Sequence, residues 1–330
     1  MGTKIAITGD GSWATALAYV LTQNDHNVIW HIRTPEIYKS LKEGGYNNIF
    51  LRFTHFTTNK PVYTQSLTEA INEAEIVLVV IPAAFIQNVF NGIPSDILKG
   101  RKIVSATKGL LPGLNITPCN YFKSKFNISE EHLAFISGPS HAEEVAQENS
   151  TFLTVFSKNT EFSRTCAGLL ENNYVKTTVS GDIDGAEYAS AMKNVMALAA
   201  GICHGLGYGE NFTAVLASSA IHEMNTFLNA HIPAERNITD YPYMGDLLVT
   251  MYSQFSRNRV FGNMIGRGYT VKSAQIEMNM IAEGYYACPA FCKIADDYRL
   301  EIPICRTVHN ILYNNANPHT AIQQLILNLQ

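Results

Sequence analysis

The sequence predicts a doubly wound α/β domain followed by a mostly α-helical domain. In the first half of the chain, short apolar runs rich in β-branched residues alternate with segments of helical periodicity. The central runs lack polar alternation, which is expected of parallel strands covered by helices on both faces. Beyond about residue 183 the strand-like runs stop and helical patterns follow. Ser180-Gly181-Asp182 interrupts the pattern, so we expect one domain at residues 1–180 and a second at residues 181–330.

The elements of the first domain are predicted from local signals. Helical periodicity predicts a helix at Trp13–Asn24, between the first two strands. Thr34 followed by Pro35 predicts the start of the next helix, because proline is favoured at the first helical position. Ser66-Leu67-Thr68-Glu69 is a capping box that opens a further helix. The predicted strands are Lys4–Thr8, Val28–Arg33, Ile76–Ile81, Lys102–Thr107, Leu133–Ser137, Phe152–Phe156 and Tyr174–Val179.

The second domain is predicted to be built from helices. Gly245-Asp246 and the stretch Ser253–Arg259 are polar or contain glycine, and we expect them to lie between helices. The predicted helices are Ile183–Leu206, Ala214–Ala230, Val271–Ala282, Ala290–Tyr298, Cys305–Tyr313 and Thr320–Leu329.

Composition excludes several classes of protein. The 330 residues have a formal charge of −4 with no long basic run, which argues against nucleic-acid binding. Charged residues are only 16% of the chain, against about 25% in a typical globular protein, and this favours a buried interface in a homodimer. The six cysteines show no metal-site spacing, so we expect free, buried thiols in a cytoplasmic protein and no metal. We expect no signal peptide and no membrane span.

A glycine motif directly follows the first strand and opens the first helix. Gly9-Asp10-Gly11-Ser12-Trp13-Ala14 fits the pattern GxGxxA. Glycines at 9 and 11 permit a tight turn and let the backbone approach a pyrophosphate, which the N-terminus of the helix attracts. An ordinary glycine turn is the alternative. The position in a strand–turn–helix unit favours a Rossmann-like dinucleotide-binding domain.

Two strand ends carry residues suited to a ligand. In sheets of this kind, ligands bind beyond the carboxyl ends of the strands. Lys108 and Gly109 follow one strand, and a lysine there can hold an anion or polarise a carbonyl, or can be a solvated turn residue. Gly138-Pro139-Ser140-His141-Ala142 follows another strand, where it can offer backbone N–H groups or simply begin a helix.

Lys193 is the only charged residue between Tyr188 and Cys203, in a helix crowded with alanine. Small neighbours allow close packing, and loss of water lowers the pKa of a lysine toward the range useful for acid–base catalysis. The alternative is a lysine that extends its ammonium group to water. Asn194 follows directly and can face the same site.

A second polar group lies between the predicted helices. Arg257, with Ser256 and Asn258 beside it, supplies the hydrogen-bond donors that a phosphate needs. A solvated loop with two exposed arginines is the alternative.

Taken together, the chain resembles the bacterial-type NAD(P)-dependent glycerol-3-phosphate dehydrogenases over nearly its whole length. The segments that carry the resemblance are GDGSWATALA at 9–18, VVIPAAF at 79–85, SATKGL at 105–110, SGPSHAEEVA at 137–146, EYASAMKNVMALAAGICHGLGYGEN at 187–211, MGDLLVT at 244–250 and SRNRVFG at 256–262.

The resemblance implies reversible reduction of dihydroxyacetone phosphate to sn-glycerol 3-phosphate, which supplies phospholipid synthesis. It implies that Lys193 is the general acid/base at the C2 oxygen and that Asp246 supports it. The implied substrate-binding residues are Lys108, Gly138, Ser140, Lys193, Asn194, Asp246, Ser256, Arg257 and Asn258. The implied cofactor-binding residues are Gly9, Gly11, Ser12, Trp13, Arg33, Lys108, Ala142, Arg257, Ile281 and Glu283.

Both NADP(H) and NAD(H) are expected as cofactors, and Arg33 favours NADPH. NAD-specific sites usually have an acidic residue at the end of the second strand, about 20 residues past the glycines. Here that strand runs into Arg33-Thr34, and no carboxylate follows until Glu36. Arg33 can pair with a 2′-phosphate or stack on adenine, so we predict that NADPH is preferred and NADH is usable.

Two other functions compete with this one. A dehydrogenase of a small 3-hydroxy acid would share the architecture, but Lys108 and Arg257 favour a phosphorylated substrate. A regulator that binds a dinucleotide without turnover would need no general acid, so Lys193 and Asp246 argue against it.

Overall fold

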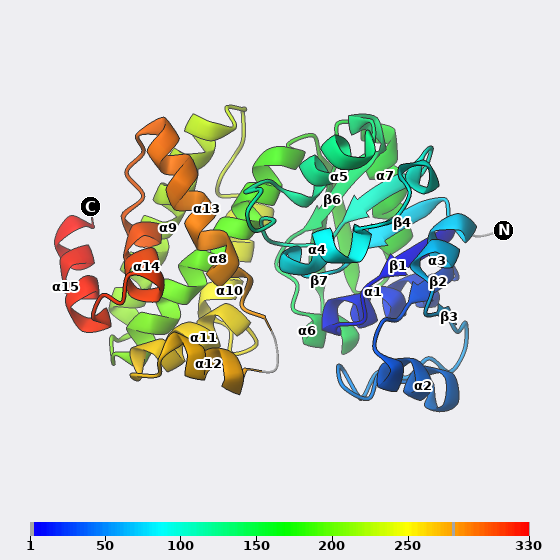
Figure 1. Ribbon diagram of the computed structural model, residues 1–330, viewed down its shortest axis with the longest axis horizontal. Coiled ribbons are helices and arrows are strands. Elements are labelled where there is room, and N and C mark those ends of the chain that lie inside the picture. The colour runs from blue at the N-terminus through cyan, green and yellow to red at the C-terminus, as the bar shows by residue number, and fades with distance from the viewer. Residues whose placement is uncertain (1–2, 279–280, 330) are drawn as a thin grey trace. The chain divides into compact units, whose positions relative to one another are not determined.

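The computed structural model describes residues 3–278 and 281–329 (Figure 1). The chain forms two compact units. Unit 1 comprises the described residues up to Ile81, together with Phe85–Thr107 and Pro118–Ile183. Unit 2 comprises Pro82–Ala84, Lys108–Thr117 and the described residues from Asp184 onward. A single sequence boundary therefore does not describe the units, because two short segments of the first half belong to unit 2.

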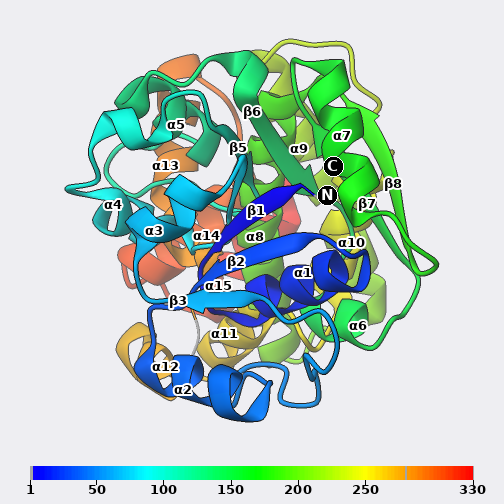
Figure 2. The ribbon, with the colours of Figure 1, turned by 90° about the vertical axis from the view of Figure 1, so that its right-hand side faces the viewer.

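Unit 1 is built on an eight-stranded sheet with the order β3-β2-β1-β4-β5-β6-β7-β8. The pairs from β3 to β6 are parallel, in the order expected of a doubly wound dinucleotide-binding domain, whereas β7 runs antiparallel to β6. Figure 2 shows β3, β2 and β1 side by side. The strands are β1 (Lys4–Thr8), β2 (Asn27–His31), β3 (Val62–Thr64), β4 (Ile76–Val79), β5 (Lys102–Ser105), β6 (Leu133–Ser137), β7 (Thr151–Phe156) and β8 (Val175–Ser180).

Helices cover both faces of this sheet, which explains why its central strands are apolar throughout. Helix α1 packs with α6 and α7, whereas α3 and α5 pack against the short helix at Ser95–Leu98 on the other side (Figure 2). The helices are α1 (Ser12–Gln23), α2 (Pro35–Gly44), α3 (Leu67–Glu73), α4 (Ala83–Phe90), α5 (Pro118–Phe126), α6 (Ala142–Ala146) and α7 (Thr160–Leu170).

The seven predicted strands are all present, with ends shifted by a few residues. The two predicted helix starts are also confirmed. Thr34 is the N-cap of α2 with Pro35 at its first position, and Ser66 Oγ accepts a hydrogen bond from the Glu69 N–H. Strand β3 was not predicted, because it has three residues and Val62 is 64% exposed, so it lacks an apolar run.

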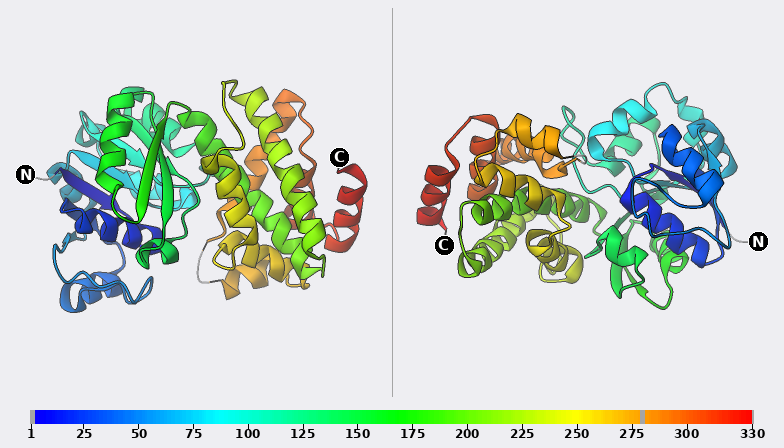
Figure 3. Two further views of the ribbon diagram at one scale, coloured as in Figure 1. Left: turned by 180° about the vertical axis from the view of Figure 1, so that it is seen from behind. Right: turned by 90° about the horizontal axis from the view of Figure 1, so that it is seen from below.

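Unit 2 is a bundle of helices (Figures 1 and 3). The helices are α8 (Ile183–Gly205), α9 (Glu210–His231), α10 (Asp246–Tyr252), α11 (Arg257–Gly266), α12 (Val271–Glu277), α13 (Glu283–Tyr298), α14 (Pro303–Tyr313) and α15 (Pro318–Asn328).

All six cysteines of the chain are buried and free, as predicted. No helix in the described ranges is both long enough and apolar enough to cross a membrane.

Three expectations about unit 2 are wrong. The polar stretches predicted to lie between helices include the starts of α10 and α11, at Asp246 and Arg257. Both helices begin with a polar residue, and this concealed their starts. The helix predicted at Val271–Ala282 ends at Glu277, and residues 279–280 of that prediction lie outside the described residues. Helix α13 begins at Glu283, well before the predicted start, and continues through Pro289.

Helices α8 and α11 pack closely against each other, and each helix has a glycine at the contact. A Cβ atom on Gly262 would lie 2.2 Å from the Leu198 carbonyl oxygen, and one on Gly201 would lie 2.1 Å from the Arg259 carbonyl oxygen. Both contacts are backbone atoms, which cannot rotate away. The two helices therefore approach more closely than any side chain would permit, and this fixes the helix that carries Lys193.

We predict that Gly262→Ala lowers stability, because its methyl group would force the two backbones apart. The expected cost is about 1–3 kcal/mol, larger than the gain of about 1 kcal/mol from alanine's helix propensity. Gly168→Ala is the matched control, since a Cβ on this α7 glycine would meet nothing within 4 Å. Thermal unfolding should show a lower midpoint for the first variant and an equal or higher one for the second. Equal midpoints for wild type and Gly262→Ala would contradict the account.

Candidate active site

The ammonium group of Lys193 is buried inside unit 2. Its helix, α8, has small neighbours on every turn, and Gly284 of α13 packs directly against the Asn194 backbone. Lys193 is 5% exposed, so its side chain does not extend to water. The predicted close packing around Lys193 is confirmed, and such a lysine needs a partner of opposite charge or a lowered pKa.

Asp246 brings Lys193 and Lys108 together. Its Oδ1 atom is 2.5 Å from Lys193 Nζ, and its Oδ2 atom is 3.0 Å from Lys108 Nζ. The three side chains come from positions far apart in the sequence, and their exposed fractions are 2% for Asp246, 7% for Lys193 and 17% for Lys108. One buried carboxylate therefore bridges two ammonium groups, of which Lys108 is the more accessible.

Thr250 completes the surroundings of Lys193 and was not predicted. Its hydroxyl accepts a hydrogen bond from Lys193 Nζ at 2.9 Å and donates one to the Asp246 carbonyl oxygen at 2.6 Å. It lies one turn after Asp246 on α10. This spacing is the signal that could have found it, but only if a helix starting at Asp246 had been predicted.

The charges in this group shift each other's pKa values. Burial is the main cause that lowers the pKa of Lys193 to about 7, with the Lys108 ammonium acting in the same direction and Asp246 opposing both. Burial alone would raise the pKa of Asp246, but Lys108 and Lys193 together bring it below its ordinary value. Near neutral pH, Asp246 is thus ionised while Lys193 can gain or lose a proton.

Asn194 and Gly109 hold the segment around Lys108. The Asn194 side-chain amide donates to the Lys108 carbonyl oxygen at 2.7 Å. A Cβ on Gly109 would lie 2.6 Å from Glu283 Oε2, so this position tolerates no larger residue without movement of that carboxylate. Asn194 is itself 6% exposed. It fixes the backbone beside the lysine, in addition to any contact with a ligand.

The three residues predicted to bind phosphate lie at the N-terminus of α11. Ser256 is the N-cap, and its hydroxyl accepts from the Arg259 N–H at 3.3 Å. Arg257 is half-buried at the first helical position. Asn258 Oδ1 accepts from the Gly284 N–H at 2.9 Å, and its Nδ2 group has no partner among the described residues. A helix N-terminus with an adjacent guanidinium group is suited to an anion.

Glu283 begins α13, and its side chain points toward the first residue of α4. Its Oε1 atom accepts from the Ala83 N–H at 2.8 Å, whereas its buried Oε2 atom has no partner among the described residues. Burial is the main cause that raises the pKa of Glu283 to about 7, and Arg257 opposes this shift. Ile281 is half-buried just before this helix.

The glycine loop of unit 1 fits a dinucleotide. Gly9 has φ +115°, and a Cβ there would lie 2.4 Å from the Val80 carbonyl oxygen, so only glycine fits. A Cβ on Gly11 would meet nothing within 4 Å, and this N-cap residue makes no side-chain hydrogen bond to α1. The positive end of a helix that follows a glycine turn is suited to a pyrophosphate. The buried indole N–H of Trp13 has no partner among the described residues.

The other predicted residues of unit 1 lie at strand ends. The Arg33 guanidinium is exposed and lies over the Phe85 ring, 5.9 Å from its centroid. Gly138 and Ser140 follow β6, and the Ser140 hydroxyl donates to the Gly138 carbonyl oxygen at 2.9 Å. Ala142 is buried at the first position of α6. These residues occupy the carboxyl ends of β2 and β6, where ligands bind in such sheets.

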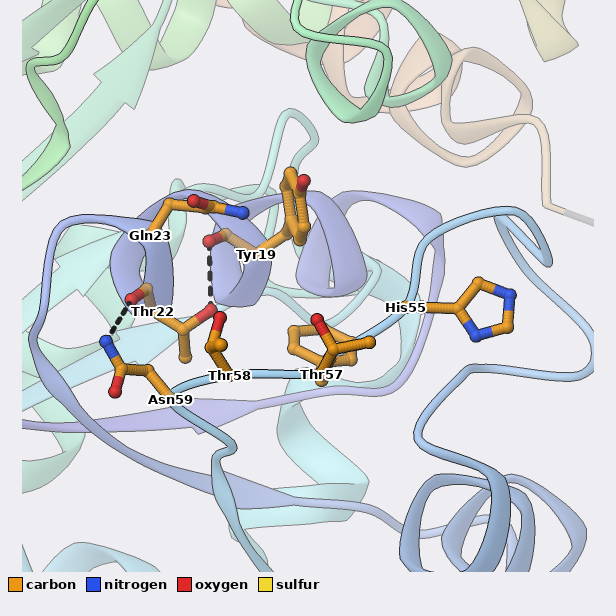
Figure 4. Close-up of a pocket in the computed structure, with 8 residues that line it drawn as sticks. Tyr19, Thr22, Gln23, His55, Thr57, Thr58 and Asn59 are labelled. Carbon is orange, nitrogen blue, oxygen red and sulfur yellow. Dashed lines mark hydrogen bonds between the residues drawn. The ribbon is translucent and has the colours of Figure 1, made fainter.

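A small surface pocket of unit 1 contains none of the predicted residues. Figure 4 shows Tyr19, Thr22 and Gln23 of α1 facing a loop. Asn59 of that loop donates to the Thr22 carbonyl oxygen at 3.5 Å. The loop residues that line the pocket are His55, Phe56, Thr57, Thr58 and Asn59. This pocket is distinct from the glycine loop.

The chain is similar to known proteins over its whole length. A glycerol-3-phosphate dehydrogenase (NAD(P)+) of Fusobacterium nucleatum is 33% identical, with 98% of this chain and 96% of that protein covered. One of Exiguobacterium sp. is 32% identical, with 98% and 95% covered. The crystal structure of glycerol-3-phosphate dehydrogenase from Coxiella burnetii matches with a TM-score of 0.91 at 28% identity, covering 98% of this chain and 99% of that chain.

Two family descriptions match successive parts of the chain. Residues 4–163 match the N-terminus of NAD-dependent glycerol-3-phosphate dehydrogenase, and residues 182–323 match its C-terminus. With the full-length relatives above 30% identity, the conclusion is that this chain belongs to the NAD-dependent glycerol-3-phosphate dehydrogenase family.

Proposed function

We propose that the protein reversibly reduces dihydroxyacetone phosphate to sn-glycerol 3-phosphate with NAD(P)H and thereby supplies phospholipid synthesis. The observation that carries this proposal is the buried contact of Asp246 with both Lys193 and Lys108. This arrangement holds one lysine with a pKa of about 7 beside a second, more accessible ammonium group. A ketone reduction that must exchange one proton near neutral pH needs such a group.

Lys193 is the general acid/base in this proposal. In the reducing direction its ammonium group donates a proton to the C2 oxygen of the substrate, and in the oxidising direction its neutral amine accepts that proton. Lys108 polarises the C2 carbonyl and contacts the cofactor. Asp246 keeps both lysines in place, and Thr250 orients the Lys193 amine through its hydroxyl.

The nicotinamide cofactor, when bound, supplies the hydride that reaches C2. Residues of unit 1 would hold it through the N-terminus of α1, the indole of Trp13 and the Arg33 side chain. In unit 2, the unpartnered Oε2 atom of Glu283 is available to a ligand's hydrogen-bond donor. The cofactor-binding set is completed by Gly9, Gly11, Ser12, Lys108, Ala142, Arg257 and Ile281.

We assign residues 1–180 chiefly to dinucleotide binding and 181–330 chiefly to substrate binding and catalysis. Substrate contacts are assigned to Lys108, Gly138, Ser140, Lys193, Asn194, Asp246, Ser256, Arg257 and Asn258. We further propose that the protein is a cytoplasmic homodimer, because its 16% charged residues leave little polar surface for a monomer of this size.

One assay separates this function from the two competing ones. Oxidation of NADH and NADPH is followed with dihydroxyacetone phosphate and then with a panel of oxo acids. Turnover on dihydroxyacetone phosphate alone is the expected result. Turnover only on an oxo acid would favour a 3-hydroxy acid dehydrogenase, and cofactor binding without turnover on either class would favour a regulator.

We predict that Arg257→Ala chiefly weakens substrate binding. A charge-assisted hydrogen bond is worth about 1.5–3 kcal/mol, so KM for dihydroxyacetone phosphate should rise roughly 10- to 100-fold, with a smaller change in kcat. Arg259→Ala is the control, because it removes a second guanidinium group from the same helix. Steady-state kinetics that show the same KM for wild type and Arg257→Ala would move the phosphate site elsewhere.

A further inference from the structure

The loop that follows the first strand places a carboxylate at the end of β2. Asp10 Oδ2 accepts a hydrogen bond from the Thr34 N–H at 2.8 Å. Thr34 is the N-cap of α2 and lies three residues beyond β2. The carboxylate that the sequence lacks at this strand end is therefore supplied from 24 residues earlier in the chain.

Backbone contacts on both sides fix the position of Asp10. The Trp30 indole N–H of β2 donates to the Gly9 carbonyl oxygen at 2.7 Å. The Asn47 side-chain amide donates to the Asp10 carbonyl oxygen at 3.1 Å, and Asn47 is fully buried. The loop is thus attached to β2 and to the segment after α2, so Asp10 has little freedom to move away from the strand end.

The second carboxylate oxygen of Asp10 remains available to a ligand. Across the residues that the structure describes, no hydrogen bond to Oδ1 is present, and the side chain is only half-buried. His31, at the end of β2, is buried, which lowers its pKa, while the nearby Asp10 acts in the opposite direction. The exposed Arg33 guanidinium lies over Phe85. A carboxylate and a guanidinium group therefore flank the same strand end.

The Asp10 carboxylate and the Arg33 guanidinium group favour different substituents at the 2′ position of the adenosine ribose. In doubly wound domains, a carboxylate at the end of the second strand accepts from the ribose 2′-hydroxyl of NAD(H), whereas an arginine accommodates the 2′-phosphate of NADP(H). The 2′-phosphate brings up to two negative charges, which a fixed carboxylate repels at short range. An expectation based on Arg33 alone leaves out this repulsion.

We propose that Asp10 determines cofactor specificity by accepting a hydrogen bond from the ribose 2′-hydroxyl of NAD(H) and repelling the 2′-phosphate of NADP(H). The proposal rests on the proposed function of unit 1 as the dinucleotide-binding part. Under this proposal, the wild-type protein binds NADH at least as tightly as NADPH. This differs from the preference for NADPH that was predicted from Arg33 alone.

Two substitutions separate this role from a purely structural one. Asp10→Asn keeps a side-chain oxygen that can accept from the Thr34 N–H but removes the charge. Asp10→Ala removes both. If Asp10 served only to hold Thr34, Asp10→Asn would behave as wild type and Asp10→Ala would weaken both cofactors equally. Glu36→Gln is the control for charge, because Glu36 lies in the first turn of α2 and is the first carboxylate in the sequence after the end of β2.

The test is direct binding of NADH and NADPH, followed by cofactor fluorescence without a second substrate. Asp10→Asn should shift the ratio of dissociation constants about tenfold or more toward NADPH, Arg33→Ala should shift it toward NADH, and Glu36→Gln should leave it unchanged. A ratio within about twofold of wild type for Asp10→Asn would overturn the proposal, as would a shift produced by Glu36→Gln instead. Wild-type protein that binds neither cofactor would overturn the dinucleotide-binding function itself.

Discussion

Lys193→Ala should lower kcat by about two to four orders of magnitude, the usual contribution of a general acid. The variant loses the buried amine that contacts Asp246. Among the described residues, Lys108 is then the remaining ammonium group in contact with Asp246. Binding of NAD(P)H should change little, because the proposal places most cofactor contacts in unit 1. Steady-state kinetics and cofactor fluorescence measure the two quantities separately.

Lys193→Arg distinguishes proton transfer from simple charge. An arginine keeps a positive charge for Asp246, but its pKa is too high for it to release a proton near neutral pH. It should therefore be nearly as inactive as the alanine variant while remaining folded, as judged by thermal unfolding. Near-normal turnover in either folded variant would contradict a role for Lys193 as acid/base.

Asp246→Asn should lower both activity and stability. Asp246 is 1% exposed, and its replacement removes the negative charge that it places beside the buried Lys193 ammonium group and the half-buried Lys108 ammonium group. Removing one partner of a buried ion pair typically costs about 3–5 kcal/mol. Because Asp246 raises the pKa of Lys193, its loss should lower that pKa further below about 7 and deplete the acid form needed for reduction. We expect kcat for reduction at pH 7 to fall roughly 100-fold or more.

The sign of the pH dependence provides a control for Asp246→Asn. Below about pH 7 the Lys193 ammonium group is charged and is repelled by that of Lys108, whereas as the pH rises through about 7 Lys193 loses its proton and this repulsion disappears. The difference in free energy of unfolding between wild type and variant should thus shrink between pH 6 and pH 9, measured by urea unfolding at each pH. A difference that stays constant would show that Asp246 acts through packing rather than charge.

The fold was predictable because its signals are local. Apolar runs with β-branched residues predicted the strands of the sheet, and the central runs are buried on both faces. The elements that were missed lack such signals. Strand β3 is exposed at Val62, α10 and α11 begin with polar residues, and α13 contains Pro289, which is unfavourable inside a helix.

The site was predictable only in part. Lys193 was found because it is a lone charge on an apolar helix, and its burial is confirmed. Its contact with Thr250 was missed, because the one-turn spacing from Asp246 is informative only on a helix that starts at Asp246, and that helix was not predicted. Asp10 occupies a variable position of the glycine motif, and no periodicity relates it to Thr34. Contacts between positions far apart in the sequence depend on the topology of the sheet, which local patterns do not contain.

The central claim is that a buried lysine with a pKa of about 7 exchanges the C2 proton, and the pH dependence of kcat/KM in both directions tests it most directly. Below this pKa the ammonium group predominates, and above it the neutral amine does. Reduction of dihydroxyacetone phosphate should therefore decline as pH rises through about 7, whereas oxidation of sn-glycerol 3-phosphate should increase over the same range. Ionisation of the substrate phosphate would instead change kcat/KM for reduction and for oxidation in the same sense. Opposite slopes with one shared pKa would support Lys193 as the acid/base, and parallel profiles, or none between pH 6 and 9, would contradict it.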